Sequence, residues 1–495
     1  MSTLLDLPRE LYDFLSRPSP QSLLIRGPAG SGKTTLGIAL LENFPGRRIL
    51  VSSRVAQDEL VREFPRLSNG GAVKVVDGSH LRHTLPEIRT VLQGAGRVIL
   101  DAEKDPTVRG LWLPSPVREA VEQLGTGENA LVVIDSWDAL VERYLGSRLG
   151  ATHGLPDRAE LERTLLDLMS RGPVFLALIL EEATPTALDY LVNGVLETGW
   201  EGVDGRAERW VRLRKLRGVR IDSAQYPFSL EGGRFHCITP ISVEGPSFLA
   251  RAEPDPSPVP GTIWPGSADY ALAFGRLALH RLTLIERDFT VPEVATRLVV
   301  STAVAHTLEQ GGRVGEMLPP SVLPEEFYRS YSRILPVSEF VRQVRFLTVA
   351  HTPELPDELR PAILPPLDRN AVGTEPRSPE LARFLTETPP DRPALLLSWL
   401  SGLRAISSAT GGSTYTPETL PGVALRYLMG APLHAIFVGP ESDPLTVALR
   451  SMASVRIRLQ QRHGRVFVFG EQPVTPGFVL TEGDEQVSYR LLRIV

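Results

Sequence analysis

A glycine-rich stretch near the N-terminus carries the strongest chemical signal in the sequence. Gly27-Pro-Ala-Gly-Ser-Gly32-Lys33-Thr34 fits the pattern G-x-x-x-x-G-K-[ST], and it stands between an apolar, strand-like run and a helical pattern. Glycines let such a loop point its N–H groups at phosphate oxygens, and the helix that follows adds its N-terminal dipole. The sequence therefore predicts a cradle for the phosphates of a nucleoside triphosphate.

Each part of this cradle has an expected role. Lys33 is expected to reach the β- and γ-phosphates, and the hydroxyl of Thr34 is expected to bind Mg²⁺. The predicted nucleotide-binding residues are Gly27, Pro28, Ala29, Gly30, Ser31, Gly32, Lys33, Thr34 and Thr35.

A site of this kind also needs an acidic residue at the end of a neighbouring strand. Asp135 follows the apolar residues of "ALVVIDSW", and we predict that it holds the metal together with Thr34. The alternative is that Asp135 caps a helix, because "DSWDALVERY" has a helical pattern. Ser136 has the same two interpretations, positioning the acid or capping the helix.

Composition limits the classes of protein to consider. With 495 residues the chain is too long for one ordinary core, and 42% hydrophobic with 22% charged residues is typical of a globular protein. Apolar runs stay well below the about 18 residues of a membrane helix, and the N-terminus lacks a signal pattern, so a cytoplasmic protein is expected. The single cysteine, Cys237, excludes an internal disulfide, and a net charge of −5 gives no general attraction to nucleic acid.

Strand-like and helical patterns alternate through the first half of the chain, which predicts an α/β domain with a mostly parallel sheet. We place this domain at 1–245, a Pro-rich extended linker at 246–266 and a second domain at 267–495. Another Pro-rich stretch, at about 352–393, is interpreted as a surface excursion or a poorly ordered insert. The strand-like runs of the first domain are "SLLIRG", "RRILVSS", "RVILDA", "ALVVIDS" and "VFLALIL".

The second domain repeats the order of the first. Residues 280–304 follow the strand–loop–helix rhythm of 21–41, and four later segments match in the same order, which favours two tandem copies of one fold. The alternative is two unrelated α/β domains with a similar rhythm. In the aligned second copy Arg287 replaces Gly27, Pro292 replaces Gly32 and Glu293 replaces Lys33. Ser398 stands in place of the metal acid, so we predict a degenerate domain that cannot bind MgATP.

Three motifs together resemble the KaiC-like branch of the RecA-superfamily P-loop ATPases: "IRGPAGSGKTTL", "VVIDSWDAL" and "LRKLRGVRIDSAQYPFSLEGGRF". The resemblance covers roughly residues 1–240 and implies a RecA-like domain that uses ATP rather than GTP. Together with the repeated segments, it leads us to expect tandem RecA-like P-loop domains, the second degenerate. In that branch a K-x-R-G element on a β-hairpin reaches the γ-phosphate held by a neighbouring subunit, and the matching residues here are Lys215, Arg217 and Gly218. Lys215 is one of only four lysines in the chain. An exposed basic strand is the alternative.

The sequence departs from that family where an acid should activate water. The family places one or two glutamates at the end of the strand after the first helix, and Ser52, Ser53 and Arg54 stand there in this chain. Asp58 and Glu59 are expected on the next helix. Glu181 remains a candidate catalytic residue, and Glu182 follows it. The alternative is that both residues simply form the polar end of a strand. We therefore predict slow or absent ATP hydrolysis.

A narrower resemblance concerns "LPRELYDFLSRPSPQSLLIRGPAGSGKTTL" and "VSSRVAQDELVREFP", which are similar to the archaeal gas-vesicle regulators of the GvpD family. That resemblance implies a P-loop regulatory protein that acts through a protein partner. The main hypothesis is thus a nucleotide-switched regulator or scaffold, with ATP-linked homo-oligomerisation as a further expectation. One alternative is a DNA-dependent, recombinase-type ATPase, which would need a basic track and a catalytic glutamate. Another is a kinase-like protein.

Overall fold

The computed structural model separates the chain into two compact units, Leu4–Thr239 and Pro240–Arg493, apart from a few residues at each terminus. Each unit is described by itself. No helix among the described residues combines the length and the apolar character needed to cross a membrane. The described residues are 7–67, 73–79, 113–124, 129–146, 157–170, 172–182, 184–203, 205–239, 249–348, 356–364, 379–389, 391–409, 415–483 and 486–494.

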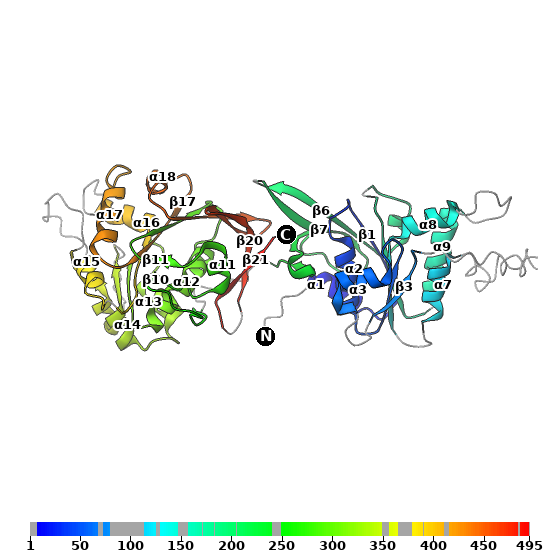
Figure 1. Ribbon diagram of the computed structural model, residues 1–495, viewed down its shortest axis with the longest axis horizontal. Coiled ribbons are helices and arrows are strands. Elements are labelled where there is room, and N and C mark those ends of the chain that lie inside the picture. The colour runs from blue at the N-terminus through cyan, green and yellow to red at the C-terminus, as the bar shows by residue number, and fades with distance from the viewer. Residues whose placement is uncertain are drawn as a thin grey trace, which may run out of the picture. The chain divides into compact units, whose positions relative to one another are not determined.

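The N-terminal unit alternates strands and helices as the sequence predicts (Figure 1). Four of the five expected strands are present as β1, β2, β4 and β5, while the fifth, at 97–102, lies outside the described residues. The strands are β1 (Gln21–Arg26), β2 (Arg47–Ser52), β3 (Lys74–Asp77), β4 (Ala130–Asp135), β5 (Val174–Ile179), β6 (Gly194–Val203), β7 (Arg206–Leu216), β8 (Gln225–Ser229) and β9 (His236–Cys237). The helices are α1 (Arg9–Leu15), α2 (Lys33–Asn43), α3 (Gln57–Glu63), α7 (Ser115–Glu122), α8 (Trp137–Gly146), α9 (Arg158–Met169) and α10 (Leu188–Leu191), with short 3₁₀ turns at Pro65–Leu67 and Glu231–Gly233.

One sheet organises this unit, and its described strands follow the order β3-β2-β4-β5-β1-β6-β7-β8-β9. The strands from β3 to β6 are parallel, and β7, β8 and β9 add antiparallel neighbours. The parallel register aligns Ser52, Asp135, Ile179 and Ile25 in one row at the carboxyl edge. Ligand sites of open α/β sheets form at this edge, so the row fixes where a site can be built.

Helices cover both faces of the sheet (Figure 1). Ile25, Leu50 and Val133 pack with α1, α2 and α3 on one face. Their chain neighbours Leu24 and Val132 pack with α7, α8 and α9 on the other. Strands buried on both faces are nearly all apolar, which explains why β1, β4 and β5 could be recognised in the sequence.

The C-terminal unit has a second large sheet. Its strands are β10 (Thr262–Ile263), β11 (Leu277–Ala278), β12 (Leu282–Arg287), β13 (Arg313–Met317), β14 (Val344–Leu347), β15 (Ile363–Leu364), β16 (Ala394–Trp399), β17 (His434–Pro440), β18 (Val455–Arg462), β19 (Arg465–Gln472), β20 (Val474–Glu482) and β21 (Tyr489–Arg493). Its helices are α11 (Ala268–Phe274), α12 (Glu293–Glu309), α13 (Pro324–Tyr331), α14 (Val337–Gln343), α15 (Pro379–Thr386), α16 (Leu400–Ala409), α17 (Leu420–Gly430) and α18 (Pro444–Leu449), with a 3₁₀ turn at Asp357–Ala362.

The described strands of this sheet follow the order β15-β14-β13-β16-β17-β12-β18-β19-β20-β21. Apart from β15, which adds an edge strand, this order repeats that of the first sheet position by position. The central strands are again parallel, and β18 to β21 are antiparallel. The mixed α/β class with two mostly parallel sheets is therefore confirmed.

The first Pro-rich stretch differs from the extended linker that its composition predicts. Ala250 is buried in the core of the C-terminal unit, and its N–H donates to the Ser330 carbonyl at 2.7 Å. Further along, Ile263 pairs with Leu277 across β10 and β11. The two ends of 249–266 thus pack onto the C-terminal unit, because Ala250, Ile263 and Trp264 are buried there, while residues 256–261 are exposed. In the second Pro-rich stretch, β15 and α15 are ordered elements, while 349–355 and 365–378 lie outside the described residues.

A buried carboxylate ties helix α1 to the rest of the N-terminal unit. Glu10 is 4% exposed, and its oxygens accept hydrogen bonds from the hydroxyl of Tyr226 at 2.8 Å and from the backbone N–H groups of Asp222 and Ser223 at 3.2 and 3.3 Å. Asp222 and Ser223 belong to the segment that connects β7 to β8, and Tyr226 lies in β8 itself. Glu10 therefore holds the end of that hairpin against α1.

Replacing Glu10 by alanine is expected to destabilise the N-terminal unit by about 1–3 kcal/mol, because the buried Tyr226 hydroxyl and two backbone N–H groups lose their acceptor. Chemical denaturation of the full chain measures this change. Asp13→Ala on the exposed side of the same helix is the matched control and should change the free energy of unfolding by less than about 0.5 kcal/mol. Equal losses in the two variants would show that Glu10 is not an anchor.

Candidate functional site

The glycine-rich loop joins β1 to α2 at the carboxyl edge of the first sheet. Strand β1 ends at Arg26, and α2 begins at Lys33 with Gly32 as its N-cap. Gly27 has a φ of 154°, and a Cβ atom there would lie 2.1 Å from the carbonyl oxygen of Thr198. Only glycine fits this turn, because both the backbone angle and the neighbouring strand β6 exclude a side chain. The strand–loop–helix context that the motif requires is therefore present.

The side chain of Lys33 extends from the start of α2 across the glycine-rich loop. The Nζ atom donates to the carbonyl oxygens of Gly27 at 2.7 Å and Pro28 at 2.8 Å, and the side chain is 8% exposed. Burial lowers the pKa of Lys33, while the nearby carboxylates Asp135 and Glu181 act in the opposite direction. A phosphate would offer this ammonium stronger, charged acceptors than two carbonyls.

Thr34 and Asp135 come together as a pair. The Thr34 hydroxyl donates to Oδ2 of Asp135 at 2.6 Å, although the two residues lie 101 positions apart. Burial raises the pKa of Asp135, and the hydrogen bond from Thr34 and the charge of Lys33 oppose that shift. One hydroxyl and one carboxylate beside a phosphate cradle are oxygen ligands of the kind that Mg²⁺ uses. This donor set fits Mg²⁺ bound together with a nucleotide.

The end of β2 carries hydroxyls in place of acids. Ser53 is buried; its N–H donates to the Asp135 carbonyl at 2.7 Å, and its Oγ accepts from the Ser136 N–H at 2.9 Å. The Ser52 hydroxyl donates to the Val55 carbonyl at 2.7 Å. Both serines thus fasten the strand end to its surroundings through backbone groups. Asp58 and Glu59 lie in the first turn of α3, as the sequence predicts.

An ion pair stands beside the serines. Nη2 of Arg54 lies 2.5 Å from Oε2 of Glu181, which follows β5. The other carboxylate oxygen of Glu181 accepts from the Ser136 hydroxyl at 3.5 Å, and its backbone N–H donates to Oδ2 of Asp138 at 2.8 Å. The sequence singled out Glu181 as a candidate catalytic acid. The structure gives this carboxylate a guanidinium partner, so it is not a free base in this arrangement.

The hairpin of β6 and β7 carries the K-x-R-G residues. Lys215 donates from Nζ to the carbonyl oxygens of Val192 at 2.6 Å and Asp189 at 3.0 Å, both in its own unit. The Asp189 carboxylate in turn pairs at 2.6 Å with Arg26, the residue before the loop. A contact of Lys215 with a neighbouring subunit stays a prediction, and it would require this lysine to leave two acceptors.

Arg217 and Gly218 form the turn after β7. Arg217 is exposed, and its carbonyl oxygen accepts from Nη1 of Arg17 at 2.6 Å. Gly218 has a φ of 79°, and a Cβ atom there would lie 1.8 Å from the same Nη1. Glycine is favoured here because this φ lies in the left-handed region, which other residues rarely adopt. The exposed Arg217 therefore lies in a turn that Arg17, two residues after the end of α1, helps to hold.

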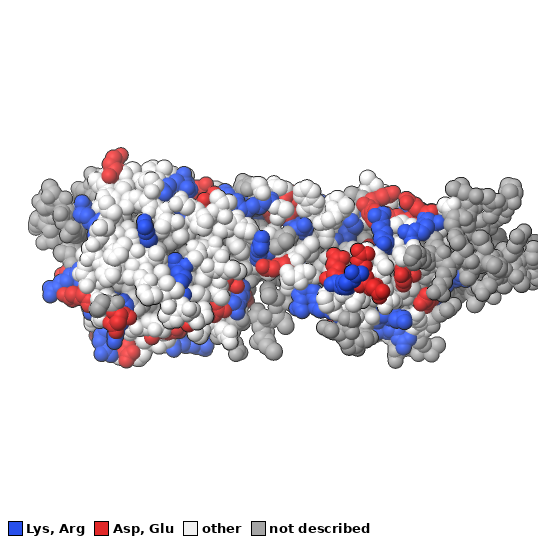
Figure 2. Space-filling view, in the orientation of Figure 1, with Lys and Arg blue, Asp and Glu red and all other residues white. Residues whose placement is uncertain are grey.

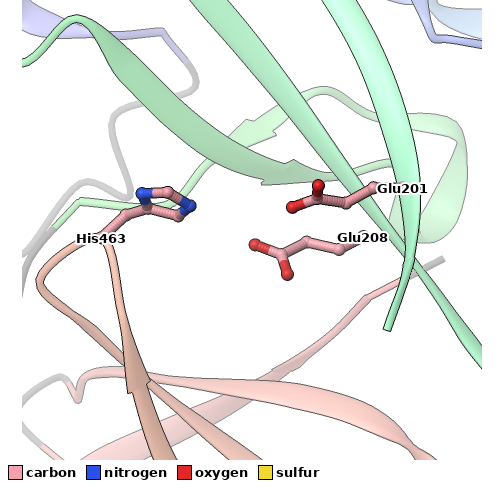
Figure 3. Close-up of side chains that lie close together, drawn as sticks. All are labelled: Glu201, Glu208 and His463. Atoms are coloured by element: carbon pink, nitrogen blue, oxygen red, sulfur yellow. The ribbon is translucent and has the colours of Figure 1, made fainter. Parts of the chain in front are cut away.

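The other end of this hairpin is acidic. Glu201 of β6 pairs in register with Glu208 of β7, and Figure 3 shows the two side chains pointing the same way. Like charges opposite each other disfavour the pairing, so the hairpin depends on its other cross-strand pairs. His463, also labelled in Figure 3, belongs to the C-terminal unit and has no part in the hairpin.

Sequence reasoning missed two residues that contact the loop. The Thr198 hydroxyl lies 2.7 Å from the Ser31 hydroxyl, and Nε of Arg209 donates to the Gly30 carbonyl at 3.4 Å. Both come from β6 and β7, which follow the loop by more than 160 positions. A lone threonine and one of many arginines give no sequence signal, and only the sheet order brings them here.

The corresponding loop of the C-terminal unit is built differently. Strand β12 ends at Arg287, and α12 begins at Glu293, with Pro292 before it. The Asp288 carboxylate accepts from the N–H and hydroxyl of Thr290, both at 2.9 Å, and closes the loop on itself. The Glu293 carboxylate accepts from the Ser321 hydroxyl at 2.9 Å. An acid thus begins the helix where the first unit has Lys33.

The end of β16 corrects one expectation about the second unit. The sequence predicts that Ser398 replaces the metal acid, but its hydroxyl donates to Sδ of Met317, on the sheet face away from α12. Trp399 packs on the α12 face instead, and its Nε1 donates to Oε1 of buried Glu316 at 3.3 Å. The alternation of side chains along a strand decides this, because a shift of one residue exchanges the faces.

Comparisons with known proteins agree with the P-loop context. Residues 11–216 match the family model of the GvpD gas vesicle protein, P-loop domain. Two curated proteins of Halobacterium salinarum are similar: Protein GvpD1 is 32% identical over 248 residues and Protein GvpD2 is 31% identical over 249 residues. Each match covers 48% of this chain, and 41% and 45% of those proteins respectively. The chain thus matches less than half the length of these relatives, and its N-terminal unit contains a P-loop domain.

The buried carboxyl group of Glu316 should make the stability of the C-terminal unit depend on pH. Burial raises the pKa of Glu316 from 4.5 to about 8, partly opposed by the charge of Arg297. The protonated form therefore stabilises the fold fully below pH 4.5, and this contribution is lost as the pH rises to about 8. The slope should reach about 1.4 kcal/mol per pH unit in that window.

Calorimetric unfolding of the full chain between about pH 5 and about pH 9 measures how the free energy of unfolding changes with pH. Glu316→Gln should flatten the dependence, because the amide keeps the shape and cannot lose the proton. Glu325→Gln, at a half-buried position on α13, is the control and should leave the slope unchanged. A slope that Glu316→Gln does not alter would contradict the assignment.

Proposed function

We propose that this protein is an ATP-binding regulatory or scaffolding protein of the KaiC-like branch of RecA-like P-loop proteins. MgATP binds in the N-terminal unit and is hydrolysed slowly or not at all. A protein partner reads the nucleotide state. The similarity to the GvpD P-loop domain supports a regulator, and the geometry of the loop supports the nucleotide.

One observation carries the proposal: the Thr34 hydroxyl and the Asp135 carboxylate meet beside Lys33 at the mouth of a glycine-rich loop. These three side chains come from two segments a hundred positions apart and serve different parts of MgATP. Lys33 holds the β- and γ-phosphates, while Thr34 and Asp135 hold the metal ion. Mg²⁺ supplies positive charge to the phosphates when it is bound.

Hydrolysis needs one more group, an acid that takes a proton from the attacking water. Ser52 and Ser53 are bonded to backbone groups, and the hydrogen bonds of the described residues give neither hydroxyl a carboxylate or imidazole partner. The candidate acid, Glu181, pairs with Arg54. This set of residues favours retention of the nucleotide over its turnover, which suits a regulatory signal.

The C-terminal unit acts in this proposal as a degenerate copy of the first. The repeated strand order supports the duplication. The loss of phosphate binding follows from Glu293, whose charge repels phosphate, and from Pro292, which has no N–H to donate. Such a copy keeps the fold as a surface for partners after the ligand site is gone.

The recombinase-type alternative gains no support from the charge pattern. On the face drawn in Figure 2, acidic and basic side chains of the described residues are mixed over each unit. Nucleic-acid grooves concentrate basic side chains so that phosphates displace counterions. Salt-sensitive binding of single-stranded DNA with stimulated hydrolysis would revive that alternative.

Nucleotide titration of the full chain tests the proposal. One MgATP should bind per chain, and Lys33→Ala should weaken binding by about 100-fold or more, since it removes a charged phosphate ligand. Lys74→Ala on β3 is the matched control, an exposed lysine outside the loop, and should bind as the unchanged protein does. Two bound nucleotides per chain would contradict the degenerate second unit, and undiminished binding by Lys33→Ala would contradict the site.

Particle size with and without MgATP tests the neighbour contact. If Arg217 reaches a nucleotide on a second copy, MgATP should increase the particle size, because a ligand that bridges two subunits stabilises their assembly. Arg217→Ala should abolish this increase and leave ATP affinity at low protein concentration within about threefold. Arg220→Ala, at an exposed position of the same turn, is the control. A monomer of unchanged size would count against the bridge.

A further inference from the structure

Arg54 and Glu181 lie just beyond the row of aligned residues at the carboxyl edge of the first sheet. Ser52, Asp135 and Ile179 are aligned across β2, β4 and β5. Arg54 follows Ser52 and Glu181 follows Ile179 by the same short interval. Because β4 lies between β2 and β5, their ion pair spans the end of β4, where Asp135 meets Thr34. The pair thus lies over the metal side of the cradle.

We propose that Arg54 is a γ-phosphate ligand supplied by the same chain, and that ATP displaces its carboxylate partner Glu181. This inference rests on the proposed nucleotide site. ATP then opens the Arg54–Glu181 ion pair, whereas ADP, which lacks the γ-phosphate, leaves it closed. In the ATPases that this chain resembles, a glutamate at this position activates the attacking water. Arg54 stands at the same position in this chain and instead binds the γ-phosphate.

The ion pair is suited to exchange. The side chain of Arg54 is 56% exposed and that of Glu181 is 39% exposed, so water screens their attraction and the pair contributes little stability. A phosphate offers a guanidinium three oxygens in a geometry that accepts two parallel hydrogen bonds. Arg54 therefore loses little when it leaves Glu181 and gains a stronger partner.

The strand order brings Arg54 to the cradle. Its ion pair with Glu181 spans the end of β4, where the Asp135 carboxylate accepts from the hydroxyl of Thr34, the residue after Lys33. Two cations of the same chain around one γ-phosphate would favour ATP over ADP.

Glu181 has a defined place to go when Arg54 leaves. Its backbone N–H is held by Asp138, which fixes the chain, and its carboxylate already lies 3.5 Å from the Ser136 hydroxyl. Release from Arg54 therefore changes a side-chain partner while the backbone stays in place. The exposed carboxylate is the signal that a partner could read.

Binding measurements separate this role from general phosphate binding. Dissociation constants for MgADP and for a non-hydrolysable MgATP analogue are measured by competition against a fluorescent ADP. Arg54→Gln should weaken the ATP analogue by roughly 10- to 100-fold, the effect of one charged hydrogen bond, and change ADP by less than about threefold. Retained ADP binding also shows that the variant is folded. Arg62→Gln, an exposed arginine on α3, is the matched control.

Two further variants complete the test. Glu181→Gln should tighten the ATP analogue, because the competing charge is gone, and should leave ADP unchanged. Arg54→Lys restores the positive charge and should recover part of the affinity for the ATP analogue that Arg54→Gln loses. If Arg54→Gln also loses affinity for ADP, the Arg54→Lys variant decides whether the charge or the fold is responsible. Equal effects of Arg54→Gln on both nucleotides, with no recovery in Arg54→Lys, would overturn the inference. Failure of the unchanged protein to bind either nucleotide would instead overturn the proposed function and with it this inference.

Discussion

The parallel register of the first sheet is the constraint on which the site depends. It aligns Ile25, Ile179, Asp135 and Ser52 at one edge, so that segments far apart in the chain end side by side. Because β5 lies between β1 and β4, the glycine-rich loop and Asp135 are separated by one strand, and α2 must carry Thr34 across that distance. A shift of the register by one residue would turn Asp135 to the opposite face and separate the pair.

Burying a charged side chain at the carboxyl edge of a sheet costs free energy, and the two units reduce this cost in different ways. In the first unit Lys33 is buried and Asp135 is half-buried, and each lowers the electrostatic penalty of the other. In the second unit the helix begins with an acid, and the buried Glu316 has a pKa of about 8, which keeps it mostly protonated at neutral pH. The first unit therefore holds paired charges that a nucleotide can recruit, whereas the second favours a neutral group.

The sequence predicts well those features that arise from neighbouring residues. The loop 27–34, the strand before it and the helix after it follow from local pattern, and so does the burial of β4. It could not predict that Arg54 meets Glu181 or that Lys215 caps the carbonyl of Asp189, because those contacts depend on strand order. The Pro-rich stretch misled for a related reason: composition predicts an extended chain but not the surface on which it packs.

A nucleotide site can lose turnover and keep binding because the two depend on different groups. In the proposed site, binding uses Lys33, Thr34 and Asp135, which the loop and the register fix together. Turnover needs an acid near the γ-phosphate, and the serines at the end of β2 instead stabilise the strand ends through backbone bonds. The Arg54 guanidinium beside these serines cannot accept a proton from water, so it does not replace the acid that is missing from the end of β2. In the proposed function, retention of ATP is the property on which a regulatory role depends.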